Sequence, residues 1–170
     1  TQRWEVIQST LTRIHVDSLG NAKSIFQIWA QAINSCILKF DGQISQIGIA
    51  MPGPFDYEKG ISYMKNQNKY DALYELPITG ALKNELHHPT VDIRYINDAA
   101  AFLQGEVFGR ELSQADCILG ITLGTGLGSA VWNKGEKAFD ADLWKDPYRE
   151  SFFEEYLVTR WFTNRFYELS

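Results

Sequence analysis

The feature that most constrains this chain is an apolar run interrupted by three glycines on alternate positions, ILGITLGTGLGSAVW. Both halves of the run have the composition of buried strands. We therefore predict strands at residues 117–123 and 128–132, joined by the glycines. A fold that contains these strands must therefore explain why three positions in or beside their connection carry no side chain.

Four explanations of Gly124, Gly126 and Gly128 compete. A dinucleotide-binding fingerprint needs a glycine where Ser129 stands, followed by a helix, and a Walker loop needs a Gly-Lys-Ser/Thr triplet that the sequence lacks. A tight turn whose bare amides and Thr125 hydroxyl hold phosphate oxygens is the third. A plain hairpin in which glycine supplies a positive φ is the fourth. We favour the phosphate clasp, because a hairpin seldom needs three alternating glycines.

Two further predicted strands are followed by residues suited to chemistry. Residues 47–51 form a continuous apolar segment that ends at Pro-Gly, and residues 91–96 precede Asn97 and Asp98 at the start of a helix. Ligands of α/β sheets bind beyond the carboxyl ends of the strands. The order of elements thus predicts an α/β layered domain whose three strand ends line one cleft.

Asn97 and Asp98 have two compatible explanations. Both residue types are good helix N-caps, and capping alone stabilises a helix by ~1 kcal/mol. A carboxylate held rigidly at a strand end can also accept a proton from a substrate hydroxyl in phosphoryl transfer. Asn97 would then hydrogen-bond a neighbouring hydroxyl.

Two loops carry weaker signals. The turn around Gly53 either only terminates a strand or presents a backbone amide to a polar ligand. Asn66 and Asn68 either form a solvated turn or offer amide groups to hydroxyls.

The remaining segments are expected to frame the sheet. The expected elements are a strand at 4–16, a helix that Ser24 caps and that ends at Asp41-Gly42, a short helix at 78–87, a helix at 97–109 and an amphipathic helix over the last 20 residues. Cys36 and Cys117 are expected to be buried, and Trp144 to pack on an irregular surface segment.

Composition limits the classes of function. The chain has 170 residues, 45% of them hydrophobic, and a formal net charge of -5. It shows no signal peptide, no apolar stretch near the ~20 residues of a membrane span and no basic run for nucleic acid. Distant cysteines and scattered histidines predict no metal site. We expect a cytoplasmic protein, and a piece of a longer one, because the chain opens in a strand-like segment and stops inside a helical one.

Together these segments resemble the ROK family of repressors, open reading frames and sugar kinases. The matching stretches, in the family's order and spacing, are IGIAMPGPFDYEKGI, KNQNKYD, VDIRYINDAAAFLQGE and ITLGTGLGSAV. The resemblance implies the actin-like ATPase (ribonuclease H-like) fold, α/β, with a mixed sheet flanked by helices. It implies a sugar-kinase lobe over residues 1–135, without its first phosphate-motif strand, and a connecting segment with the start of a C-terminal lobe helix over 136–170.

The resemblance also implies a function and its residues. It implies a glucokinase-like kinase that transfers phosphate from ATP, with Mg²⁺, to a hydroxyl of a hexose or N-acetylhexosamine, and a homodimer is compatible with it. Asp98 is implied to be the general base. The implied sugar-binding residues are Gly53, Asn66, Asn97, Asp98 and Glu154, and the implied phosphate clasp is Gly124, Thr125 and Gly126. Glu154 is equally well explained as the solvated face of a helix.

The chain departs from the family in two places. It lacks the Asp-x-Gly-Gly-Thr phosphate motif, and residues 133–151 contain no His or Cys where the family has a Gly-His segment and a zinc loop. The absence of the Gly-His segment and the zinc loop predicts either a zinc-free branch of the family or a different way of binding the anomeric side of the sugar. Sugar-sensing repressors of the same family are the second class of function, although nothing here resembles their DNA-binding module. The sequence does not identify the sugar.

Overall fold

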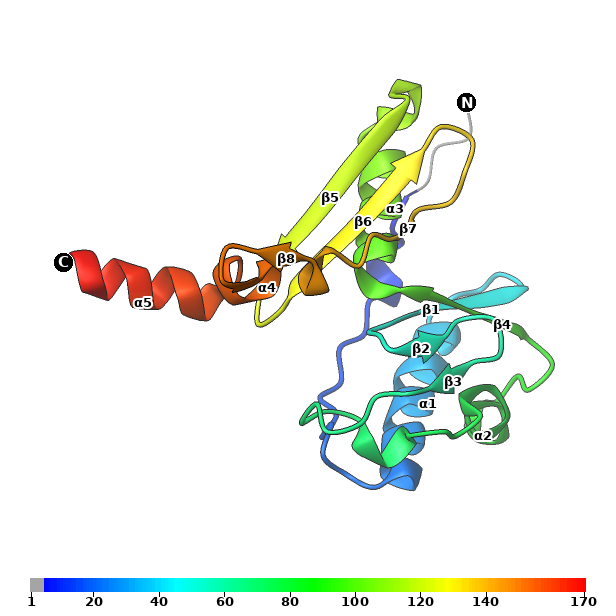
Figure 1. Cartoon of the computed structure of the whole chain (residues 1–170). Helices are drawn as coiled ribbons and strands as arrows, with labels where there is room; N and C mark the ends of the chain where they lie inside the picture. Colours follow the sequence, from blue (N-terminus) through cyan, green and yellow to red (C-terminus); the bar gives the residue numbers. More distant parts are fainter. Residues whose placement is uncertain (1–4) are drawn as a thin grey trace. The chain divides into compact units, whose positions relative to one another are not determined.

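The chain, studied as a computed structural model that describes residues 5–170, divides into two compact units (Figure 1). The first ends at Ile96, and the second covers Asn97–Ser170. Each is described by itself below. The expected lobe boundary after residue 135 stays a prediction, as does the single cleft at the strand ends.

The first unit combines two helices with short sheets. Its elements are η1 (Gln8–Thr10), α1 (Ala22–Leu38), β1 (Gln46–Met51), β2 (Phe55–Asp56), β3 (Ile61–Ser62), η2 (Asp71–Leu73), α2 (Ile78–Glu85) and β4 (Asp92–Asn97), whose last residue begins the second unit. β1 pairs with β4, and β2 pairs with β3 in antiparallel register. The predicted strands at 47–51 and 91–96 and the predicted short helix at 78–87 are therefore present.

Helix α1 is amphipathic and packs on this unit's core. Buried apolar side chains from the helix and the segments around it form one cluster, namely Ile25, Phe26, Met51, Phe55, Met64, Leu73 and Ile78. The predicted cap is one turn off, because the Asn21 carboxamide oxygen accepts from the Ser24 backbone N–H at 2.9 Å. Asn21 is thus the N-cap, and Ser24 is the residue whose amide it satisfies.

The predicted strand at 4–16 is wrong over the residues that the structure describes, and Trp4 lies outside them. Residues 5–16 contain the 3₁₀ turn η1 and irregular backbone. Thr10 donates to the Ile7 carbonyl from both its backbone N–H, at 3.0 Å, and its hydroxyl, at 2.8 Å. Such local hydrogen bonds compete with the bonds of a β-sheet. The β-branched residues of this segment favoured a strand in the sequence-based prediction and gave no sign of these bonds.

The second unit is built on an antiparallel sheet. Its elements are α3 (Asp98–Gly109), η3 (Leu112–Gln114), β5 (Cys117–Leu123), β6 (Leu127–Asn133), β7 (Phe139–Asp140), η4 (Leu143–Lys145), β8 (Pro147–Tyr148), β9 (Ser151–Phe152), α4 (Phe153–Tyr156) and α5 (Thr159–Leu169). The sheet order is β5-β6-β7, and Leu123 faces Leu127 across the glycine turn. The predicted pair of strands on either side of the glycines and the predicted helix behind Asn97 are both confirmed.

Helix α3 packs closely on one face of this sheet (Figure 1). A Cβ added at Gly120 would lie 3.0 Å from Leu103 Cδ1, and one added at Gly128 would lie 3.2 Å from Ala99 Cβ. Gly128 is therefore needed for helix-on-strand packing near the N-terminus of α3. Residues on the other face of β5, Cys117 among them, are exposed. The expectation of a buried Cys117 is wrong, and Cys36 is partly buried.

The predicted C-terminal helix is interrupted. The chain leaves α4 at Leu157 and adopts an extended conformation at Val158, with φ -129° and ψ 157°, before α5 begins. Val158 is fully buried, and the Thr159 backbone N–H donates to the Gly124 carbonyl at 2.9 Å. The break between α4 and α5 therefore lies where the chain bonds to the glycine turn. Over residues 5–170, no helix has both the length and the hydropathy to cross a membrane.

Candidate active site

The N-cap explanation is confirmed for Asn97, whereas the role of Asp98 as a general base stays a prediction. Asn97 is 7% exposed, and its carboxamide oxygen accepts from the Ala100 backbone N–H at 3.1 Å, so it caps α3. Asp98 follows as the first helical residue, and one of its carboxylate oxygens accepts from the Ala99 N–H at 2.9 Å. Because Asn97 provides the cap, the Asp98 side chain stays exposed to solvent. A negative charge is favourable at this end of a helix.

The glycines of the turn are needed because other residues approach the backbone closely there. Gly124, Thr125 and Gly126 are exposed, and the Gly124 N–H donates to the Gly126 carbonyl at 3.1 Å. None of Gly124, Gly126 and Gly128 has a φ in the left-handed region, so the hairpin explanation by positive φ is wrong. A Cβ added at Gly126 would lie 2.9 Å from a carboxylate oxygen of Glu154. The phosphate clasp stays a prediction that this exposed turn permits.

Glu154 lies against the glycine turn. Its carboxylate accepts from the Leu127 backbone N–H at 2.9 Å, and the residue is partly buried. Together with the bond from Thr159 to Gly124, it fastens the segment around α4 to both sides of the turn. The explanation of Glu154 as a solvated helix residue is therefore wrong. Its role as a sugar ligand stays a prediction.

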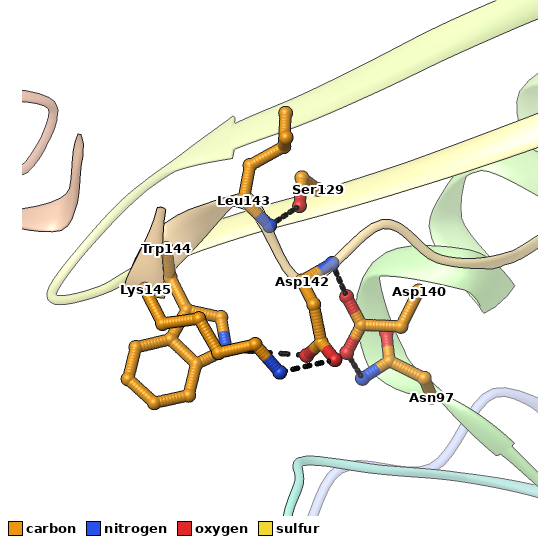
Figure 2. Close-up of polar contacts among 7 residues, drawn as sticks. All are labelled: Asn97, Ser129, Asp140, Asp142, Leu143, Trp144 and Lys145. Carbon is orange, nitrogen blue, oxygen red and sulfur yellow. Dashed lines mark hydrogen bonds and ion pairs between the residues drawn. The ribbon is translucent and has the colours of Figure 1, made fainter. Parts of the chain in front are cut away.

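Asp140 is a member of the site that the sequence analysis missed. Figure 2 shows its carboxylate between the Asn97 amide and the backbone of Asp142. The Asn97 side-chain N–H donates to Asp140 Oδ2 at 3.0 Å, and the Asp142 backbone N–H donates to Asp140 Oδ1 at 2.8 Å. The only signal in the sequence is a cluster of aspartates in FDADLWKD, and it does not say which of them turns inward.

The surroundings of Asp140 oppose its negative charge. Burial raises the pKa of this carboxyl group, and the charges of Asp142 and Asp98 raise it further. The N–H of Asp142 and the charge of Lys145 lower the pKa, but the net direction is upward from the ordinary value of 3.8.

Asp142, which donates to Asp140, makes further polar contacts at the surface. Lys145 Nζ lies 2.7 Å from Asp142 Oδ2, and this hydrogen bond raises the pKa of Lys145. The Trp144 indole N–H donates to Asp142 Oδ1 at 3.3 Å, so both side chains point toward one carboxylate (Figure 2). The Trp144 ring is 45% exposed, contrary to the expectation that it packs.

The other two predicted sugar ligands, Gly53 and Asn66, belong to the first unit. Gly53 is half-buried, and an added Cβ there would meet only the Tyr57 hydroxyl, at 3.7 Å. Asn66 is exposed, with a φ of 58°, and its backbone N–H donates to the Asp71 carboxylate at 3.1 Å. Their binding role stays a prediction. Within residues 5–170, no group of three or more His, Cys, Asp or Glu side chains is arranged to hold a metal ion.

The site of the second unit thus has two parts. Asn97, the neighbour of Asp98, donates to Asp140, and the Leu127 N–H at the glycine turn donates to Glu154. The Asp98 side chain is exposed at the N-terminus of α3, and Gly124, Thr125 and Gly126 are exposed in the glycine turn. The ROK family model matches residues 7–139, and this chain belongs to the ROK family.

Similar proteins include kinases and a regulator. An N-acetyl-D-glucosamine kinase of Mannheimia succiniciproducens is 27% identical over 134 residues, which are 77% of this chain and 42% of that protein. A ROK-family glucokinase of Streptomyces griseus, solved with glucose and AMPPNP, matches with a TM-score of 0.65 at 17% identity, over 88% of this chain and 50% of that chain. A ROK-family transcriptional regulator, a homologue of the E. coli MLC protein, matches with a TM-score of 0.61 at 16% identity, over 88% and 41%.

These similarities establish the fold. The chain has the α/β, actin-like ATPase fold of the ROK sugar kinases. It spans less than half the length of the curated relative that it matches.

Proposed function

We propose that the protein is an ATP-dependent sugar kinase that phosphorylates a hydroxyl of a hexose or N-acetylhexosamine. The observation that carries this proposal is the exposed carboxylate of Asp98, fixed at the N-terminus of α3 by the Asn97 cap. The similarity to N-acetyl-D-glucosamine kinases makes an N-acetylhexosamine the first acceptor to test.

In the proposed reaction, Asp98 is the general base. Its exposed carboxylate takes the proton of the sugar hydroxyl, which the family resemblance places at C6, while the hydroxyl oxygen attacks the terminal phosphorus of ATP. The bond between that phosphorus and the leaving ADP oxygen breaks. A base so placed contributes ~10²–10⁴-fold to the rate.

The glycine turn is proposed to hold the phosphates. The residues suited to them are Gly124, Thr125 and Gly126, whose exposed backbone and one hydroxyl fit the donor set that phosphate oxygens need. Mg²⁺, when bound with ATP, neutralises charge that develops on the phosphate oxygens. Gly53, Asn66, Asn97 and Glu154 are the proposed sugar-binding residues.

The test follows ADP release from Mg-ATP with the natural full-length protein and a panel of hexoses and N-acetylhexosamines. We expect turnover on at least one sugar, and a fall in kcat of at least ~10²-fold for Asp98→Asn. Asp116→Asn is the matched control, because it removes an exposed carboxylate of the same unit that lies outside the site. A kcat for Asp98→Asn within a few-fold of wild type would refute the role of Asp98.

A sugar-sensing regulator without catalysis is the second candidate function. The observation in its favour is the structural match to a ROK-family transcriptional regulator. Calorimetry separates the two functions. Tight binding of one sugar without ADP release from any sugar would favour the regulator, and Asn97 and Asp98 would then act in recognition only.

A further inference from the structure

We propose that Asp140 is a positioning residue for the Asn97–Asp98 pair, since it holds the Asn97 amide in the orientation that caps α3 and presents Asp98. The part of this proposal that concerns catalysis rests on the proposed kinase function. The part that concerns Asn97 rests on the geometry of the second unit and is tested separately below.

The carboxamide oxygen and the amide nitrogen of Asn97 each make a hydrogen bond within the second unit. The oxygen accepts from the Ala100 N–H at 3.1 Å, and the nitrogen donates to Asp140 at 3.0 Å. Rotation of the amide by half a turn would place its nitrogen against the N–H of Ala100 and its oxygen against the carboxylate of Asp140. Both new contacts would be repulsive, so Asp140 fixes the orientation that makes the cap.

Asp140 is itself held from both neighbouring elements. β7 pairs with β6 so that Asp140 faces Ala130, and the Ala141 N–H donates to the carbonyl of the buried Ser129 at 3.0 Å. On the side of α3, the Ala138 N–H donates to the Gln104 side-chain oxygen at 2.8 Å. A short strand bonded to both the sheet and the helix thus places the Asp140 side chain beside Asn97.

The charge of Asp140 is not explained by stability. The charged groups that face it are Asp98 on α3 and Asp142 and Lys145 on its own segment, and two of these three are carboxylates. A half-buried carboxylate beside two others disfavours the folded state when all are ionised. A neutral residue would be better tolerated there, and the carboxylate is useful as an acceptor for two donors at once.

The variant Asp140→Asn distinguishes a role of Asp140 in positioning Asn97 from a role in the stability of the fold. Asn97 and Asp142 donate to different oxygens of Asp140, and Asp140→Asn replaces one of these oxygens by an NH2 donor, so one of the two donors loses its acceptor while the unfavourable charge is removed. In the full-length protein we expect kcat to fall at least ~10-fold, KM for the sugar to change by less than ~3-fold, and Tm to stay equal or rise. Asp146→Asn, which removes an exposed carboxylate of the same segment, should leave all three quantities unchanged.

A second measurement does not depend on activity. With asparagine side chains labelled with ¹⁵N, the amide signal of Asn97 should shift with pH at a midpoint above 3.8, and this titration should vanish in Asp140→Asn. An Asn97 signal that is the same in both proteins and insensitive to pH would overturn the proposal. A kcat within ~2-fold of wild type, or a fall in kcat matched by a fall in Tm, would also overturn the positioning role. If wild type phosphorylates no sugar, the kinase function fails, and the titration alone decides whether Asp140 holds Asn97.

Discussion

Replacement of Gly128 by alanine tests how closely the first turn of α3 packs on β6. This packing positions Asn97 and Asp98 relative to the sheet. The added Cβ would lie 3.2 Å from Ala99 Cβ and against the Thr122 hydroxyl. The Thr122 side chain can rotate away. The Ala99 Cβ cannot, because it is attached directly to the backbone of the first turn of α3, next to Asp98.

The helix must therefore move by a few tenths of an ångström, or the strands must part. Overpacking of this kind destabilises a protein by about 1–3 kcal/mol. In thermal unfolding of the full-length protein, we expect the Tm of Gly128→Ala to fall by at least ~2 °C. The displacement of α3 should also lower kcat, since it moves the carboxylate of Asp98.

Gly105 provides a control of opposite sign. It lies inside α3, and a Cβ added there would meet no atom within 4 Å. Alanine favours a helix interior by about 0.5–1 kcal/mol over glycine, so Gly105→Ala should raise Tm. Equal or higher stability of Gly128→Ala would refute the claim that this glycine is required for close packing.

Three further outcomes follow from the contacts of single side chains. Asn21→Ala should lower stability by about 1 kcal/mol in thermal unfolding, whereas Ser24→Ala should be nearly neutral, since only the backbone N–H of Ser24 takes part in the cap. The raised pKa of Asp140 means that its protonated form favours folding, so the stability that it contributes at acid pH is lost as pH rises through its folded pKa. The Tm advantage of Asp140→Asn over wild type should accordingly grow between about pH 3 and pH 7, and a constant difference would contradict this reasoning. Glu154→Ala should cost about 1–2 kcal/mol and speed hydrogen exchange at the Leu127 amide, and exchange at the wild-type rate would show that the carboxylate does not hold that amide.

The predictable parts of the site are those that neighbouring residues define. The apolar segments around the glycines identify β5 and β6, because alternation and turn residues are local in sequence. Asn97 and Asp98 identify the start of α3 for the same reason. The helical period also found α1, although the choice between Asn21 and Ser24 as its cap depends on which side chain reaches which amide.

The missed parts depend on contacts between distant residues. Asp140 is 43 positions from Asn97, and Glu154 is 27 positions from Leu127, so no local pattern encodes either bond. The interruption at Val158 has the same origin, because a helical sequence yields there to a bond with the glycine turn. Tertiary contact overrides propensity at these positions.

The alternation of exposure along β5 has a consequence for handling the chain. Leu119, Ile121 and Leu123 are 46–52% exposed, and over residues 5–170 the backbone of β5 pairs on one edge only, with β6. An apolar strand with an open edge is a template on which strands of other molecules can add. Preparations of the 170-residue chain should therefore be most prone to aggregation through this strand, and a lysine at Ile121 would be the first change to make for solubility.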